Sequence, residues 1–384
     1  MERSVTAIVF EGGQAEHPLA GPMLSVRSAV TLDTLDKLRQ LQEVAKVVVC
    51  SDRPEVLAGA QAMGLVIEQQ PAEPFHFGRW LQDIVRRHAR DAVLYLGGAS
   101  APLMTRADFA AAAGLLGWGG PRVVANNPQS PDLIGFYPAD LLESLEPPAS
   151  DNALGLALRD LPVEMLLVPV SCRASFDLDT PADLLIYREI LRASRSGAGF
   201  SRPAEAGPGT LRAIEALEWN QPAWEAALRR VRQPFADMAI IGRVGAPLVA
   251  HLNQTYTLRL RVFSEERGMK ALGREARGEV RTLLGAYLED VGPARFFQRM
   301  AEVAGVAFID TRPLLAHGGR RVSEADRFAS DLGLVDSIRD PWVAEFTAAA
   351  FDAALPVVLG GHSLVSGGLW ALLDYAVRPV AAKA

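Results

Sequence analysis

Cysteine and histidine are scarce in this chain of 384 residues, which has two cysteines and six histidines. Cys50 and Cys172 are far apart in the sequence, and neither belongs to a metal-type spacing. Zinc sites need several cysteine or histidine ligands at short intervals, so no zinc site is indicated. We expect both cysteines to be reduced thiols in the core of a cytoplasmic protein.

The sequence also lacks a surplus of basic residues, a long apolar run and a signal-peptide pattern. Its formal net charge is −6, whereas a nucleic-acid-binding surface needs a basic face. A membrane-spanning helix needs about 20 consecutive apolar residues. We therefore expect a cytoplasmic protein that binds neither nucleic acid nor membranes, and assembly into a homo-oligomer stays open.

The first half of the sequence alternates between apolar runs and helical patterns. Continuous apolar runs are typical of strands whose two faces are both covered by helices. The predicted strands are 5–10, 46–50, 65–67, 92–96, 122–125 and 133–137, and the predicted helices are 30–41, 56–63, 77–89, 108–116 and 151–158. This alternation predicts an α/β domain with a doubly wound, mostly parallel sheet in three layers.

A stretch rich in serine, glycine and proline separates this half from the rest of the chain. We predict a first domain over 1–192, a linker over 193–209 and a separate helix-rich α/β domain over 210–384. For the last domain the predicted helices are 244–263, 275–288, 294–304 and 343–354, and the predicted strands are 306–309 and 356–359.

The most informative stretch is Phe176-Asp177-Leu178-Asp179-Thr180-Pro181-Ala182-Asp183-Leu184, which follows an apolar run. Asp179 or Thr180 can cap a helix whose first turn contains Pro181. Asp177 and Asp179 lie at the end of the predicted strand and face the start of that helix. A well-capped helix start and a functional pair of acids both stay open from these residues alone.

This stretch resembles the closing motif of the GT-A-like nucleotidyltransferases, which include the molybdenum-cofactor and phospholactate guanylyltransferases. The resemblance covers about the first half of the chain and implies a GT-A, Rossmann-like fold there. It also implies transfer of a nucleotidyl group from a nucleoside triphosphate to a phosphorylated small molecule, with release of pyrophosphate. An acid of this motif helps to hold the catalytic magnesium in that family, so the resemblance implies Asp177 and Asp179 as catalytic Mg²⁺ ligands.

Two other family motifs are changed in this sequence. Gly12 and Gly13 follow the first strand as in the family and would lie near the phosphates, but no lysine or arginine occurs between Glu11 and Val26. Ser100 stands where the family has its central aspartate, and its hydroxyl can only hydrogen-bond the nucleotide or bind a metal weakly. The resemblance therefore leaves two functions open: a nucleotidyltransferase, or a degenerate relative that binds a ligand or a partner.

Two polar segments outside these motifs are further candidates. Asn126 follows the strand 122–125, where ligands of open α/β sheets bind, so its amide is a candidate contact to the nucleotide. A turn is the alternative role for Asn126. Gly361, His362 and Ser363 lie between an apolar run and a predicted helix, which indicates an anion or phosphate site, with a structural glycine turn as the alternative.

A last polar cluster extends over 310–331. Asp310 ends a predicted strand, which is a suitable place for a functional acid. Ser323 and Asp326 have the spacing of a capped helix start. We interpret this cluster as structural.

Overall fold

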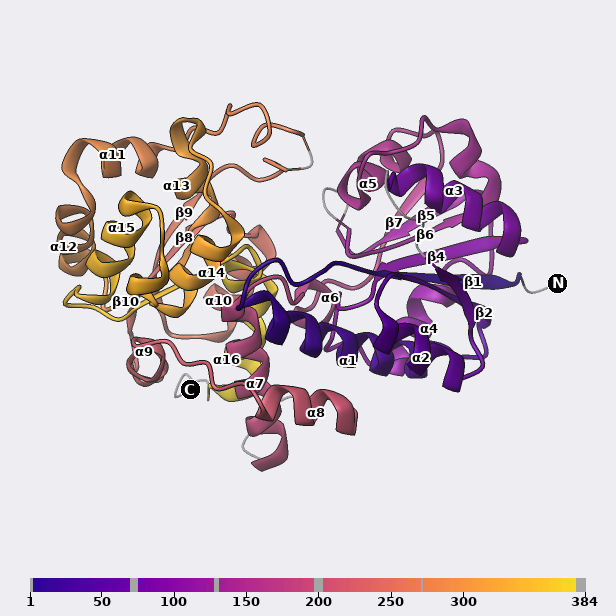
Figure 1. Ribbon diagram of the computed structural model, residues 1–384, viewed down its shortest axis with the longest axis horizontal. Helices are drawn as coiled ribbons and strands as arrows, with labels where there is room; N and C mark the ends of the chain where they lie inside the picture. The colour runs from indigo at the N-terminus through magenta and orange to yellow at the C-terminus, as the bar shows by residue number, and fades with distance from the viewer. Residues whose placement is uncertain (1–2, 70–74, 128–130, 197–202, 271, 378–384) are drawn as a thin grey trace. The chain divides into compact units, whose positions relative to one another are not determined.

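The computed structural model describes residues 3–69, 75–127, 131–196, 203–270 and 272–377 (Figure 1). Contacts within the chain divide it into two compact units, each with its own sheet. The first unit comprises Met1–Ala15, Leu24–Asp177 and Glu205–Ala213. The second unit comprises Glu16–Met23, Leu178–Ala204 and Ile214–Ala384.

The first unit contains a seven-stranded sheet in the order β3-β2-β1-β4-β6-β5-β7. Its strands are β1 (Val5–Glu11), β2 (Val44–Ser51), β3 (Val66–Gln69), β4 (Ala92–Gly97), β5 (Arg122–Ala125), β6 (Leu133–Tyr137) and β7 (Glu164–Leu167). Strand β6 pairs antiparallel with β4 and β5, and the other pairs are parallel. The predicted doubly wound, mostly parallel sheet is confirmed.

Helices cover both faces of this sheet, as the continuous apolar strands predict. They are α1 (Ala20–Leu38), α2 (Pro54–Ala62), α3 (Phe77–His88), α4 (Arg106–Gly114), η1 (Ala139–Ser144), α5 (Asp151–Arg159), α6 (Cys172–Ser175) and α8 (Pro208–Glu215). Val5, Ala7 and Val9 of β1 pack in the core beneath α1, α2 and α4. Ile8 joins the opposite core beneath α3 and α5 (Figure 1).

The second unit contains a four-stranded sheet in the order β11-β10-β8-β9, and all of its pairs are parallel. Its strands are β8 (Asp237–Gly242), β9 (Arg259–Ser264), β10 (Val306–Asp310) and β11 (Val357–Gly360). Its helices are α7 (Pro181–Ser196), α9 (Trp224–Val231), α10 (Ala246–Thr255), α11 (Leu283–Val291), α12 (Pro293–Val303), α13 (Arg312–Ala316), η2 (His317–Gly319), α14 (Glu324–Leu332), η3 (Val335–Ser337), α15 (Pro341–Phe351), η4 (Ser363–Val365) and α16 (Gly367–Ala376). The predicted helix-rich α/β character is confirmed.

Two predicted helices of this unit are wrong in extent. The pattern over 244–263 contains helix α10 and then strand β9, and the pattern over 275–288 contains helix only from Leu283. Strand β9 lies at an edge of the sheet and is partly exposed, so its sequence, Arg-Leu-Arg-Val-Phe-Ser, lacks the apolar continuity of the inner strands.

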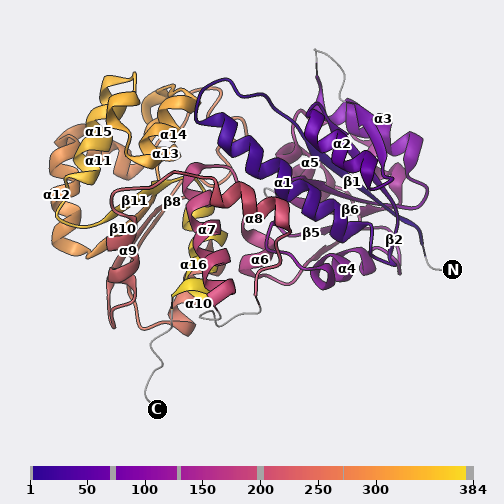
Figure 2. The same cartoon turned by 60° about the horizontal axis from the view of Figure 1, so that its bottom comes forward.

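Helix α7 belongs to the second unit, although the predicted boundary placed it in the first domain. It packs against α14, α16 and β11, and Figure 2 shows α7 and α16 side by side. The reason is its broad apolar surface, because Leu184, Leu185, Ile186 and Ile190 are all buried. Contacts therefore group α7 with the second unit, and the chain passes between the two units at several points, one of them after Asp177. The predicted domain boundary stays a prediction.

Part of the predicted linker, 197–202, lies outside the described residues. Residues that follow it pack with the first unit: the Gly207 amide donates to Asp33 Oδ2 at 2.6 Å, and Lys37 Nζ donates to the Glu205 carbonyl at 3.3 Å. Across the residues that the structure describes, no helix has both the length and the apolar character needed to cross a bilayer.

Candidate functional site

The glycine loop of the first unit follows β1 at the carboxyl edge of the sheet. Gly13 has a φ of +110°, which side-chain-bearing residues rarely adopt, and its amide donates to Asp52 Oδ1 at 3.2 Å. Parallel pairing brings Glu11 opposite Ser51 at the end of β2. The loop is therefore held at the place where ligands of open α/β sheets bind.

A buried ion pair lies directly beneath this loop. The guanidinium of Arg27 donates to both carboxylate oxygens of Glu11, at 3.0 and 3.2 Å. The Glu11 side chain is fully buried, whereas that of Arg27 is 25% exposed. Glu11 also accepts a hydrogen bond from the Ala99 amide at 3.2 Å. The first arginine after the glycine loop is thus bound to a carboxylate of the chain.

Ser100 and Asp177, which are far apart in the sequence, pair in the first unit through an isolated antiparallel β-bridge. Ser100 lies in the turn after β4, where its amide donates to the Gly97 carbonyl at 3.2 Å. The bridge therefore places the first acid of the closing motif beside the position that holds the central aspartate in the family that the sequence resembles.

The side-chain amide of Asn126 takes part in four hydrogen bonds with other described residues. Its Nδ2 donates to Asp132 Oδ2 at 3.1 Å and to the Ala174 carbonyl at 2.7 Å. Its Oδ1 accepts from the amides of Asp132 and Leu133 at 3.0 and 3.2 Å. These bonds use both donors and both lone pairs of the amide, and they tie the end of β5 to the start of β6. The predicted contact of Asn126 to a nucleotide stays a prediction.

The closing motif continues into the second unit, where it caps α7. Asp179 is exposed, and Asp183 is fully buried. Asp183 Oδ2 accepts from the amides of Asp179 and Thr180 at 3.1 and 2.8 Å and from Thr180 Oγ1 at 2.8 Å. Burial, and then the neighbouring charge of Asp179, raises the pKa of Asp183 to about 8. The capped helix start is thus present, and its cap comes from Asp183.

This helix start packs against the glycine turn after β11, so two segments that the sequence singles out separately meet in the second unit. A Cβ at Gly360 would lie 2.7 Å from Ala182 Cβ, and one at Gly361 would lie 2.6 Å from Thr180 Cγ2. Both distances are shorter than side chains allow. The two glycines are required because the backbone approaches α7 so closely.

His362 and Ser363, the other residues of the predicted anion site, have unequal exposure. Ser363 is buried, and His362 is partly buried. Burial, and then the charge of Arg243, lowers the pKa of His362 to about 4. His362 is therefore neutral at pH 7, and the predicted anion site over 361–363 stays a prediction.

Two buried ion pairs lie at the carboxyl edge of the second sheet. Arg243, which follows β8, binds Asp310 through Nε at 2.6 Å and Nη2 at 3.2 Å. Burial alone raises the pKa of Asp310, but the charge and hydrogen bonds of Arg243 outweigh burial and lower it. Arg312 binds both oxygens of Asp331 at 2.8 and 2.7 Å. Asp310 and Asp331 are each fully buried.

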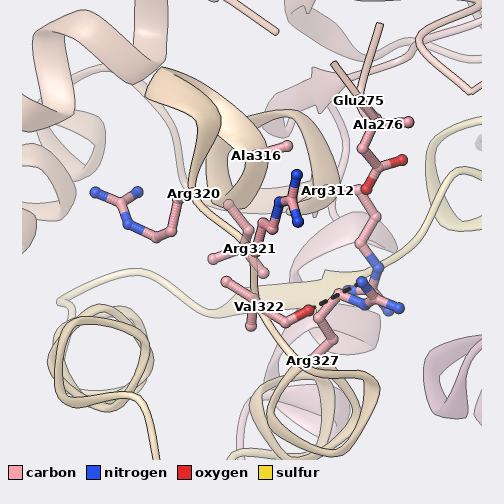
Figure 3. Close-up of a pocket in the computed structure, with 9 residues that line it drawn as sticks. Glu275, Ala276, Arg312, Ala316, Arg320, Arg321, Val322 and Arg327 are labelled. Carbon is pink, nitrogen blue, oxygen red and sulfur yellow. Dashed lines mark hydrogen bonds between the residues drawn. The ribbon is translucent and has the colours of Figure 1, made fainter. Parts of the chain in front are cut away.

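A cavity of about 320 Å³ lies next to the second of these pairs (Figure 3). Its lining is rich in arginine and comprises Glu275, Ala276, Arg312, Leu315, Ala316, Arg320, Arg321, Val322 and Arg327. The sequence pattern of this segment indicates a structural helix start and does not predict the cavity. The feature of the sequence that could have indicated the cavity is the spacing of four arginines, Arg312, Arg320, Arg321 and Arg327. The helix cap at Ser323 explains the same segment more simply.

Asp177 and Asp179 are the predicted ligands of Mg²⁺. Among the described residues, no group of three or more histidine, cysteine, aspartate or glutamate side chains is arranged to hold a metal ion. Asp177 and Asp179 provide two carboxylates, a donor type that suits Mg²⁺. Mg²⁺ binding by these two acids therefore stays a proposal.

No protein-family model matches the sequence, and no curated protein matches it. Solved structures similar to the chain include a nucleotidyl transferase from Methanothermobacter thermautotroptrophicus, at 16% identity and a TM-score of 0.39, covering 48% of this chain and 96% of that one. A cytidylyltransferase from Leptospira borgpetersenii has 15% identity and a TM-score of 0.38, covering 56% and 93%.

A third similar structure is that of CMP:2-keto-3-deoxy-manno-octonic acid synthetase complexed with CTP. It has 16% identity and a TM-score of 0.36, and it covers 49% of this chain and 98% of that one. These proteins are nucleotidyl- or cytidylyltransferases, the class that the closing motif resembles.

Proposed function

We propose that this chain is a nucleotidyltransferase-like protein whose first unit binds a ligand or a partner without transferring a nucleotidyl group. The main support is the buried ion pair between Glu11 and Arg27. Nucleotidyl transfer needs positive charge around the triphosphate. Here the first arginine after the glycine loop is neutralised by Glu11, so this ion pair adds no net positive charge at the edge of the sheet.

The neighbouring positions support the same proposal. Ser100 supplies a hydroxyl where a carboxylate would bind Mg²⁺ more strongly. The amide of Asn126 is engaged within the chain, and Asp52 accepts from the glycine loop. This combination of acids and hydroxyls favours a ligand that presents hydrogen-bond donors over a nucleoside triphosphate.

A pyrophosphate-release assay tests this proposal directly. The full chain is incubated with each of the common nucleoside triphosphates, Mg²⁺ and a pool of phosphorylated small molecules. We expect no release above the rate without protein. Mg²⁺-dependent release that scales with protein concentration would exclude the proposal.

Active nucleotidyl transfer to a phosphorylated small molecule is the second candidate, and the bridge between Ser100 and Asp177 favours it. In this function Asp177 and Asp179 hold Mg²⁺, and Gly12 and Gly13 lie near the phosphates. A phosphate oxygen of the acceptor forms a bond to the α-phosphorus. The bond from that phosphorus to the bridging oxygen breaks, and pyrophosphate leaves.

Calorimetric titration with Mg²⁺ and each triphosphate distinguishes the two candidates. The second candidate requires binding that is lost in Asp177→Ala and Asp179→Ala. Asp140→Ala is a matched control, because Asp140 is an exposed acid of the first unit outside these motifs. Equal binding by all variants, or none by the unchanged chain, would remove the second candidate.

A further inference from the structure

The arginine-lined cavity is built entirely from the second unit, so its role can be inferred without reference to the first. Its volume of about 320 Å³ is at the lower end of ligand pockets, which span roughly 300–1,000 Å³. Arg312 and Leu315 come from α13, Arg327 from α14, and Arg320 and Arg321 from the segment between them. Three adjoining segments thus direct cationic side chains to one small volume.

Two of the arginines have partners elsewhere in the unit. Arg312 is buried, and its bidentate contact with Asp331 neutralises its charge. The guanidinium of Arg320 lies over the ring of Trp342, 3.8 Å from its centroid, and also faces Glu289 at 3.8 Å. Figure 3 shows the Arg320 guanidinium directed away from the other cavity arginines. These two residues form the wall of the cavity.

Arg321 and Arg327 differ from this pair. Within the described residues, the guanidinium of Arg321 makes no hydrogen bond or ion pair. The guanidinium of Arg327 donates to the Val322 carbonyl at 3.1 Å and, across the same residues, has no carboxylate partner within ion-pair distance. Burial, and then repulsion by Arg312, lowers the pKa of Arg327, and the nearby charges of Glu275, Glu324 and Asp331 only partly offset this. The cavity therefore holds positive charge that a bound anion would stabilise.

We propose that this cavity binds the phosphate group of a small phosphomonoester, with Arg321 and Arg327 as its ligands. A phosphomonoester carries about −1.5 to −2 charges at pH 7, which two guanidinium groups balance. The planar fork of arginine also matches the spacing of phosphate oxygens. The site is distinct from the predicted anion site at Gly361, His362 and Ser363.

The remaining lining residues define the rest of this ligand. Leu315, Ala316 and Val322 give apolar surface for a short carbon chain. Glu275 adds a carboxylate, which accepts hydrogen bonds from hydroxyl groups and repels a second anionic group. The ligand class that fits is a small hydroxylated molecule with a single phosphate, and the inference does not depend on the function proposed for the first unit.

Isothermal titration calorimetry of the full chain at low ionic strength tests the proposal with defined probes. They are glycerol 3-phosphate, methyl phosphate and acetate. We expect glycerol 3-phosphate to bind tightest, because its hydroxyl groups reach Glu275. Methyl phosphate should bind more weakly, and acetate at least tenfold more weakly than glycerol 3-phosphate. No binding of either phosphate ester, or acetate binding as tightly as both, would overturn the proposal.

Variants locate the binding in the cavity. Arg321→Gln and Arg327→Gln should each weaken glycerol 3-phosphate binding at least tenfold, or about 1.4 kcal/mol. Glu275→Ala should reduce the preference for glycerol 3-phosphate over methyl phosphate. Arg229→Gln is the matched control, because Arg229 is an exposed arginine of the second unit that does not line the cavity.

The exposed position of Arg321 keeps the test decisive if Arg327→Gln fails to fold, because Arg321 can be replaced without opening the core. Thermal unfolding monitored by circular dichroism checks the fold of every variant. Unchanged affinity in folded Arg321→Gln, or an equal loss in Arg229→Gln, would overturn the proposal.

Discussion

The two sheets of this chain both end in charged side chains, but they balance those charges differently. At the edge of the first sheet, Glu11 is buried and binds Arg27, so the cation is neutralised there. At the edge of the second sheet, Asp331 neutralises Arg312, and Arg321 and Arg327 remain beside the cavity without a carboxylate within ion-pair distance among the described residues. The carboxyl edge of the first, mostly parallel sheet thus carries an ion pair whose charges neutralise each other. The carboxyl edge of the second, parallel sheet borders a cavity with positive charge.

This difference shows that the fold of a unit does not by itself decide whether that unit binds an anion. The carboxyl edge of a parallel sheet provides the position for a ligand. The charge that remains after internal pairing decides which ligand is attracted. In this chain the motif resemblance indicates the first unit, whereas the arginine-lined cavity lies in the second.

The largest effect that tests this comparison is expected for Asp331→Asn. It leaves Arg312 buried without its charge partner, which should lower the free energy of unfolding of the second unit by about 3–5 kcal/mol. Urea unfolding followed by circular dichroism measures the change. The double variant Arg312→Met with Asp331→Leu removes both charges and should recover most of the loss. If the double variant is as unstable as Asp331→Asn, charge compensation is not the cause.

The glycines of the two edges provide the next comparison. Gly360→Ala should destabilise the second unit by about 1–3 kcal/mol, because the new Cβ meets Ala182 at 2.7 Å. Gly13→Ala should cost about 1–2 kcal/mol for a different reason, since its φ of +110° strains an L-residue while its surroundings are open. Unfolding titrations measure both. In an Ala182→Gly background Gly360→Ala should be milder, and an unchanged cost there would contradict the steric explanation.

The pH dependence of the second unit gives a further test through Asp183. Its pKa of about 8 in the folded state exceeds that of an unfolded aspartate, so the folded state retains a proton that the unfolded state loses. The stability contribution is full below about pH 4 and falls as pH rises to 8, by at most about 1.4 kcal/mol per pH unit. Asp183→Asn should remove this slope in unfolding measurements.

His362 acts with the opposite sign in part of the same range. Its lowered pKa of about 4 means that the unfolded state binds a proton more readily, so stability falls as pH drops from about 6.5 to 4. Between pH 7 and 8 His362 is neutral in both states, and Asp183 alone of the two titrates. An equal slope in the unchanged chain and Asp183→Asn in that interval would contradict the assignment.

The smallest expected effect is that of Asp179→Ala on stability. Asp179 is exposed, and its backbone amide supplies its hydrogen bond to Asp183, so replacing the side chain should change the free energy of unfolding by less than about 0.5 kcal/mol. Urea unfolding of the variant measures it. A loss above 1 kcal/mol would show that Asp179 has a structural role and would weaken its assignment as a metal ligand.

The sequence predicts the first sheet well because its evidence is local. The apolar runs that become β1, β2 and β4 are continuous, and each is followed by a turn or a helix. Strand β9 was missed because Arg259 and Arg261 interrupt its apolar pattern, and both arginines pair with Asp237 on the neighbouring strand. That partner cannot be read from local periodicity.

The candidate sites were predictable only in part. The position of Asp177 at a strand end follows from the motif, but its bridge to Ser100 joins distant segments. The buried role of Asp183 and the partners of Asn126 also depend on tertiary packing. The cavity was not predictable, because whether an arginine remains unneutralised depends on where every carboxylate lies after folding.

The second unit is built from separate segments of the chain, and this affects how it folds during synthesis. Helix α7 leaves the ribosome well before α16, yet the two pack together in the finished molecule. Until α16 arrives, Ile186 of α7, which lies against Gly368 of α16, has no complete core to enter. We therefore expect a nascent chain truncated after 210 to expose the apolar surface of α7 to solvent. A fragment that begins at 210 should have an incomplete hydrophobic core, because it lacks α7. The two units are made in overlapping order, and α16 completes a core that was begun near the middle of the chain.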